Sequence, residues 1–164
     1  MSNSAIAIRM VALSVFLKML VYAMHWQHTS YERIYFFANV LILMSGIFFG
    51  IRQFKKSMNA KTDFLQDVKA GMKVAALYAI MMTLFVYIYY KFIDTGYFQV
   101  KLENQLELAR QNDLDVEKAR EMGEFALSAF FQSTVTMVGF LMLGSFYASI
   151  ITFFLRRIKG FANN

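Results

Sequence analysis

The chain has 164 residues, of which 58% are hydrophobic and 17% aromatic, and its formal net charge is +6. This is far more apolar surface than a soluble domain of this length can bury. The absence of cysteine excludes disulfides, thiolate metal ligands and cysteine nucleophiles. We therefore expect a single membrane domain over residues 1–164.

Four apolar runs are each long enough to cross a bilayer, which takes about 17–25 residues. They cover residues 5–24, 34–51, 74–93 and 129–155. Because the chain contains no proline, we expect the spans to be nearly straight helices. The predicted fold class is all-α: an integral membrane four-helix bundle with an extracytoplasmic helical hairpin between helices 3 and 4.

The first run contains a lysine, which distinguishes it from a signal peptide. Lys18 interrupts the apolar stretch, and residues 21–25 lack a small-x-small cleavage pattern, so we expect the run to stay in the mature protein. Lys18 lies beyond the middle of the run. Its ammonium group is expected to snorkel to the outer interface or to pair with a loop carboxylate, and a functional role inside the membrane is the alternative.

The turn after the first run carries histidines at a spacing that zinc ligands can use. His25 and His28 are three residues apart, and Glu32 follows four residues later. The turn is short and rich in aromatic residues such as Trp26, which are typical of a membrane interface. We therefore interpret the histidines as solvated loop residues and predict no metal site.

Small residues recur at helical spacing in three of the four runs. Gly46 and Gly50 form a Gly-x-x-x-Gly pair, Gly71 begins a series with Ala75, Ala79 and Thr83, and Gly144 is followed by Ala148 and Thr152. Such stripes let helix backbones approach closely. We predict that the candidate helix-packing residues Gly46, Gly50, Gly71 and Gly144 pack helices within one bundle, with a homo-oligomer interface as the alternative.

The segment before the third run has helix-start signals. Thr62 is the predicted N-cap, with Asp63 in the first turn. Phe64, Leu65, Val68 and Met72 would then form one apolar face, and we expect this helix to lie along the inner membrane surface before the third span begins.

The long segment 97–127 also has helical periodicity. Phe98, Leu102, Leu106 and Ala109 are spaced for one helix, residues 111–113 form a polar stop, and a second helix is predicted to run through Ala119, Met122 and Ala126. We interpret the segment as a helical hairpin that folds on itself or on the bundle rim.

Basic residues predict the orientation of the chain. Six Lys or Arg residues lie in segment 52–73, and Arg156, Arg157 and Lys159 follow the fourth run. The positive-inside rule places both segments, and with them the N and C termini, in the cytoplasm. This accounts for the net charge, so we expect a lipid bilayer partner and no nucleic acid. Segment 94–129, with eight acidic and four basic residues, would lie on the other side.

Few polar groups lie within the runs. None of the four runs contains Asp or Glu. The candidate intramembrane polar residues are Lys18, Lys91, Asp94, at the outer margin of the third run, and Gln132. Lys91 and Asp94 are three residues apart, which allows them to pair on one helix face. Nucleotide-binding loops, hydrolase elbows and metalloprotease helices are not found, so we predict no enzyme activity, no catalytic residues and no cofactor.

Three stretches carry a family resemblance: residues 48–56, a junction of the form Phe-Gly-Ile-basic-Gln-aromatic, residues 64–71 and residues 89–94. From about Leu41 onward the chain resembles a family of small four-span bacterial membrane proteins catalogued as a domain of unknown function. The chain differs by having Thr95-Gly96 where the family pattern has proline. The resemblance implies the fold and a bacterial inner-membrane location, and it assigns no functional residue.

Two functions fit these observations. The first is a non-enzymatic accessory or scaffold protein that presents segment 97–127 to an extracytoplasmic protein partner. The alternative is a small channel or carrier subunit that works as a homo-oligomer, with Lys18 and the polar start of the fourth run lining a path.

Overall fold

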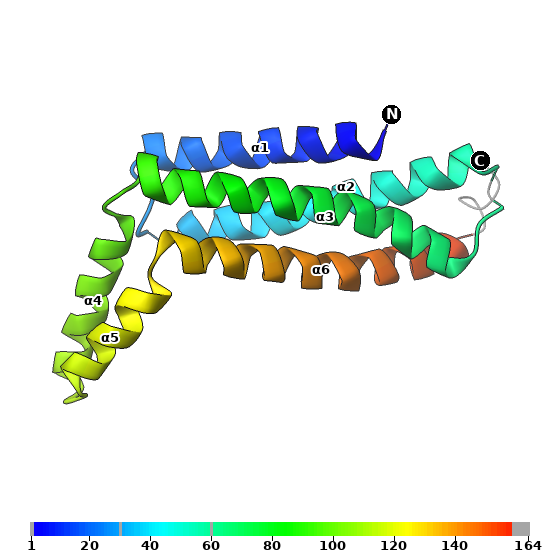
Figure 1. Cartoon of the computed structure of the whole chain (residues 1–164). Coiled ribbons are helices and arrows are strands. Elements are labelled where there is room, and N and C mark those ends of the chain that lie inside the picture. The colour runs from blue at the N-terminus through cyan, green and yellow to red at the C-terminus, as the bar shows by residue number, and fades with distance from the viewer. Residues whose placement is uncertain (1, 30, 60, 159–164) are drawn as a thin grey trace.

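The computed structural model describes residues 2–29, 31–59 and 61–158, and every regular element in them is helical (Figure 1). Four helices are long and apolar enough to cross a membrane, which confirms the predicted all-α fold class. These four are α1 (Asn3–Ala23), α2 (Tyr31–Ser57), α3 (Phe64–Ile88), which continues as the π-helical turn η1 (Tyr89–Ile93), and α6 (Ala129–Arg157). Two shorter helices, α4 (Tyr97–Gln111) and α5 (Val116–Ala126), lie between η1 and α6.

The four long helices form one bundle in which α3 packs against α1, α2 and α6 (Figure 1). The side chains of Leu43, Ile47, Val74 and Tyr78 are fully buried at its centre. Many other large apolar side chains on these helices are exposed, for example Phe16 and Leu84. A bundle with a small core and an apolar outer surface is expected where lipid surrounds the helices.

Close helix contacts occur at all four glycines that the sequence singled out. A β-carbon on any of them would lie within 3.0 Å of a side chain on a neighbouring helix, so no larger residue fits without a shift. The contacts are Gly46 with Met10, Gly50 with Val74, Gly71 with Ile47 and Gly144 with Ala75. At these four points the absence of a side chain lets the helix backbone come close to the neighbouring helix.

The start of α3 differs from the prediction. Asp63, not Thr62, is the N-cap: its carboxylate accepts a hydrogen bond from the Gln66 backbone at 2.7 Å, and the Gln66 side chain accepts one from the Asp63 backbone at 3.0 Å. This reciprocal capping box satisfies two otherwise unpaired backbone donors, and the helix continues unbroken into the span. The segment predicted as a surface helix is therefore the first part of α3, and Phe64 and Leu65 of its predicted apolar face are exposed.

The helices α4 and α5 pack side by side and project obliquely from one end of the bundle, with α5 on the bundle side of α4 (Figure 1). Gly123 lies against α4, because a β-carbon there would be 2.5 Å from Leu102. Met122, which the predicted pattern placed on the packed face, is 63% exposed. We call this end the α4–α5 end. The opposite end, where Lys55, Lys56, Arg156 and Arg157 lie, we call the basic end. Lys159 is outside the described residues.

Candidate functional site

A cavity of about 430 Å³ lies between α2, α3 and α6 near the α4–α5 end of the bundle. Its walls are mostly apolar and aromatic, including Phe85, Phe140 and Leu143. Lys18 of α1 and Glu32 of α2 supply charged groups to the lining. Sequence reasoning singled out Lys18 and Gln132 from this lining.

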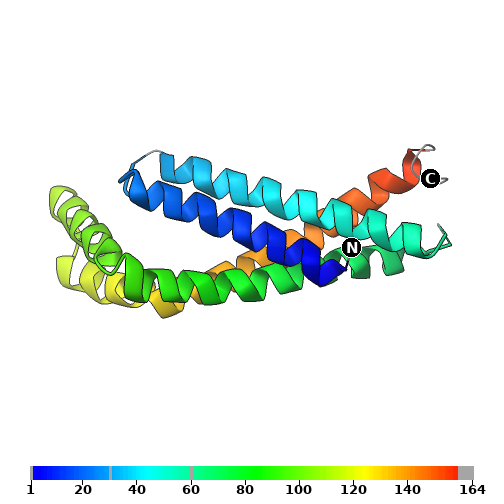
Figure 2. The ribbon, with the colours of Figure 1, turned by 90° about the horizontal axis from the view of Figure 1, so that it is seen from above.

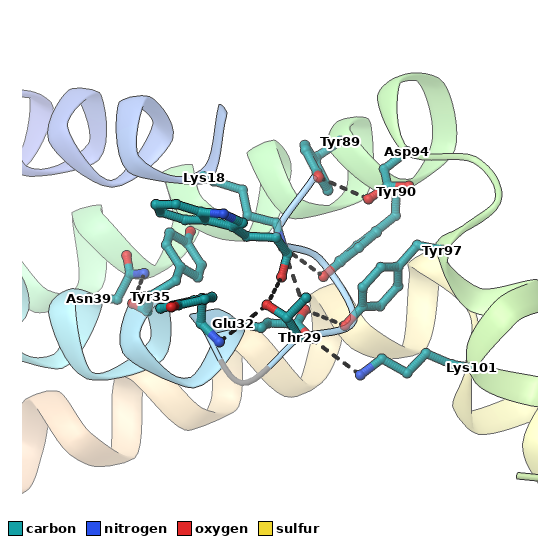
Figure 3. Close-up of polar contacts among 12 residues, drawn as sticks. Lys18, Thr29, Glu32, Tyr35, Asn39, Tyr89, Tyr90, Asp94, Tyr97 and Lys101 are labelled. Atoms are coloured by element: carbon teal, nitrogen blue, oxygen red, sulfur yellow. Dashed lines mark hydrogen bonds and ion pairs between the residues drawn. The ribbon is translucent and has the colours of Figure 1, made fainter. Parts of the chain in front are cut away.

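Lys18 lies in a group of tyrosines from three elements (Figure 3). The residue is only 4% exposed. Its Nζ lies 4.9–5.5 Å from the ring centroids of Tyr35, Tyr89, Tyr90 and Tyr97, within the range of cation–π attraction. It also donates to the Tyr90 hydroxyl at 3.4 Å. The ammonium group is therefore held inside the protein, where the aromatic faces offset part of the cost of its burial.

Glu32 at the start of α2 is the carboxylate nearest to Lys18. Its Oε1 lies 3.8 Å from Lys18 Nζ, and its Oε2 lies 3.2 Å from Lys101 Nζ on α4. The Tyr97 hydroxyl donates a hydrogen bond to the same carboxylate (Figure 3). Burial raises the pKa of the Tyr97 hydroxyl, so this group stays protonated and remains a donor. One carboxylate thus joins α1, α2 and α4.

Lys91 and Asp94 do not pair with each other, contrary to the spacing argument. Lys91 is exposed and donates to the Tyr87 hydroxyl at 3.0 Å, whereas Asp94 accepts from the Tyr89 hydroxyl at 3.0 Å. The π-helical turn explains the difference. The Asp94 backbone N–H bonds to the Tyr89 carbonyl five residues earlier, so the two side chains are not on one α-helical face.

Gln132, the fourth residue of α6, lies on the cavity wall. Its Nε2 donates to the carbonyl of Ala126 at 3.0 Å. This bond spans the break between α5 and α6, where Ser128 caps α6 by accepting from the Phe131 backbone at 3.2 Å. The side-chain amide therefore supports the junction as well as lining the cavity.

A second charge cluster lies at the basic end, and sequence reasoning missed it. Asp67 on α3 is fully buried, and its Oδ2 lies 3.3 Å from Lys55 on α2 and 2.8 Å from Arg156 on α6. The predicted third span, 74–93, does not include Asp67, whereas α3 begins at Phe64 and contains it. The missed signal is spacing: Asp67 lies four residues before Gly71, which puts it on the same helix face as the small residues Gly71, Ala75 and Ala79.

A hydrogen-bonded group at mid-bundle was also missed. The Tyr78 hydroxyl lies 2.8 Å from Ser14 Oγ and donates to Asn39 Oδ1 at 2.9 Å, and all three residues are buried. The bonds join α1, α2 and α3. Buried polar groups in a membrane protein are usually satisfied in this way.

The histidine turn has no arrangement of metal ligands within the described part of the chain. No group of three or more His, Cys, Asp or Glu side chains is found there in a geometry that could hold a metal ion. His28 stacks instead on the Tyr97 ring, with centroids 4.8 Å apart. This contact adds to those that hold α4 against the turn.

These features define a small membrane-type helical bundle with a partly charged cavity near one end. The chain belongs to the family described as Protein of unknown function (DUF4199), whose model matches residues 5–157. This confirms the resemblance found in the sequence and extends it to α1 and the first part of α2. No curated protein and no solved structure matches the chain.

Proposed function

We propose that the protein is a non-enzymatic accessory or scaffold protein of a bacterial inner membrane that presents the α4–α5 pair to an extracytoplasmic protein partner. In this proposal both termini are cytoplasmic, and the protein acts by binding, without a cofactor. The basic residues at one end of the bundle support this orientation through the positive-inside rule.

One observation carries the proposal: the α4–α5 pair is fixed to the bundle and yet exposes large apolar side chains. Glu32 holds α4 through Lys101 and Tyr97. On α5, Met122 is 63% and Phe125 70% exposed, and their spacing of three residues puts them on one helix face. A rigid element with an uncovered apolar patch is typical of an interaction surface.

The charge around this patch indicates what kind of surface the partner has. Segment 94–129 carries eight acidic and four basic residues, and α5 itself has three acidic residues (Glu117, Glu121 and Glu124) against two basic ones (Lys118 and Arg120). A partner surface with an apolar centre and a basic rim would match both properties. We therefore propose a partner protein with such a surface.

The alternative of a channel or carrier needs a polar path across the membrane. The cavity offers Lys18 and Gln132 at one end. Further along the bundle, Leu43 and Ile47 of α2 and Val74 of α3 are fully buried in the apolar core. Because these side chains leave no polar path there, we favour a binding role over conduction. A homo-oligomer would have to form the path between copies.

Site-specific photo-crosslinking in native membranes tests the proposal. A photoreactive amino acid at position 125 is expected to give an adduct with one protein, identified by mass spectrometry. The control is the same amino acid at position 154, an exposed phenylalanine near the other end of the bundle. The variants Met122→Ser and Phe125→Ser should each weaken binding of the identified protein, because they remove apolar contact area.

A second variant separates presentation from folding. Residues 102–125 are replaced by a short flexible linker, which removes Met122 and Phe125 and keeps Lys101 with its contact to Glu32. The bundle should still insert and fold, whereas the adduct partner should no longer co-purify. Retention of that partner would refute the proposal. Solute flux in liposomes that disappears in Lys18→Leu would support the alternative.

A further inference from the structure

Figure 2 shows that α2 and α6 diverge toward the α4–α5 end of the bundle. The cavity of about 430 Å³ lies in this region, with α3 as its floor, and we call it the α2–α6 groove. Its volume is within the range of small-molecule sites. Phe36 and Val135 line it and are 56% and 49% exposed, so the groove meets the surface that faces lipid.

The polarity of the groove changes along its length. Gln132 and Glu32 lie near the helix ends, where α6 and α2 begin, whereas Leu143 and Phe140 lie deeper along α6. The 11 residues from Gln132 to Leu143 correspond to about 16 Å of helix at about 1.5 Å per residue. This is about half of the roughly 30 Å hydrocarbon core, the depth of one leaflet.

Lys18 at the polar end lacks close hydrogen-bond acceptors. Among the described residues its oxygen contacts are the Tyr90 hydroxyl at 3.4 Å and Glu32 at 3.8 Å, although an ammonium group has three donors. Ordinary N–H···O bonds measure about 2.7–3.2 Å. The side chain is buried and lines the groove, so an oxygen of a bound molecule would provide the acceptor that the protein does not.

We propose that the α2–α6 groove binds a phospholipid of the surrounding bilayer. One acyl chain lies along Phe140 and Leu143, and phosphate or ester oxygens accept hydrogen bonds from Lys18. The order of polar and apolar groups along the groove is that of an amphiphile lying in its own leaflet, and phospholipid is the amphiphile that the surrounding bilayer supplies. This proposal goes beyond the scaffold function and does not depend on a partner for the α4–α5 pair.

Gly139 offers a way to fill the groove without disturbing the bundle. It lines the groove, and a β-carbon there would have no atom within 4 Å. Gly139→Leu therefore puts a side chain where the acyl chain is proposed to lie. Val138, the preceding residue, is 48% exposed and is not part of the lining, so Val138→Leu is the matched control.

The experiment uses the full chain in vesicles that contain phosphatidylglycerol with a diazirine in one acyl chain. After photolysis, peptide mapping should find the label concentrated on residues 132–143 and on the facing part of α2. Gly139→Leu should reduce this labelling by about tenfold, because the leucine side chain takes the space of the acyl chain and weakens lipid binding. Val138→Leu should leave the labelling within about twofold of the wild-type value. Thermal stability of both variants in detergent shows whether the fold is kept.

The head-group contact is tested by competition. Unlabelled phosphatidylglycerol should displace the probe better than hexadecane or a free fatty acid does, and Lys18→Met should remove that advantage. Equal labelling of Gly139→Leu and Val138→Leu would overturn the proposal, as would labelling of residues 132–143 no stronger than that of the exposed Phe146. Hexadecane or fatty acid competing as well as phosphatidylglycerol would also overturn it.

Discussion

The guanidinium group of Arg156 binds the carboxylate of Asp67, with Nη2 2.8 Å from Oδ2, and this contact joins the last turn of α6 to the first turn of α3. Arg156 also donates to the carbonyl of Thr62 at 2.6 Å, just before the cap of α3. Lys55 adds α2 to the same carboxylate at 3.3 Å. Three spans are thus fastened at the basic end by one acidic side chain.

Asp67→Asn is expected to destabilise the protein strongly. The amide keeps the shape of the carboxylate but leaves the buried Lys55 without a counter-charge, which costs about 3–5 kcal/mol in buried ion pairs. The free energy of unfolding in mild detergent measures the effect. Glu107→Gln removes an exposed pair with Arg110, and it should change that free energy by less than about 1 kcal/mol. Similar losses in both variants would contradict the structure.

Gly144→Leu and Gly139→Leu place the same side chain on the same helix in different surroundings. A β-carbon at Gly144 would lie 2.5 Å from that of Ala75, whereas one at Gly139 meets nothing within 4 Å. Gly144→Leu should lower the free energy of unfolding by about 1–3 kcal/mol or more, because added bulk separates α3 from α6. Gly139→Leu should leave the melting temperature nearly unchanged. The reverse order would place the helix contact elsewhere.

Tyr78→Phe removes the hydroxyl that joins Ser14 and Asn39. Both side chains are buried and would lose a partner, which should lower the free energy of unfolding by about 1–2 kcal/mol. Tyr87→Phe is the control, since that hydroxyl only accepts a bond from the exposed Lys91. Denaturant titrations of the two variants compare them directly, and equal midpoints would mean that the Tyr78 bonds add no stability.

The orientation predicted from the basic residues is testable with reporters. An enzyme that is active only outside the cytoplasm should be inactive when fused after Asn164 and active when inserted near Asn112, in the turn between α4 and α5. Activity after Asn164 would reverse the topology and would place the α4–α5 pair in the cytoplasm.

The four long helices were predictable because span length and hydrophobicity are properties of each run alone. The glycine contacts followed from local spacing in the same way. The start of α3 was predictable only in part: the sequence indicated a helix beginning near Thr62 but placed it on the membrane surface. In the structure Asp63 caps this helix, Asp67 pairs with two other helices, and the same helix continues into the span.

The candidate site could be predicted only in part. Lys18 stood out because a charge within an apolar run is costly. Its surroundings come from Glu32, Tyr90 and Tyr97, which belong to three other elements and meet Lys18 only when those elements pack together. Nothing in the sequence of a single span specifies which tyrosines will face it, so the cluster and the cavity had to come from tertiary structure.

The π-helical turn at the end of α3 and the non-helical residues 94–96 that follow it together set the direction in which the α4–α5 pair leans. Tyr89–Ile93 contains one residue more than an α-helical turn would need, and one residue corresponds to about 100° of rotation around the helix axis. Removing a residue from this turn is expected to rotate the pair, with Met122 and Phe125, about the axis of α3, and the contacts of Tyr97 and Lys101 with Glu32 would have to break. A single-residue insertion or deletion in this turn would therefore change the direction in which the surface around Met122 and Phe125 faces. The residues of that surface would stay the same.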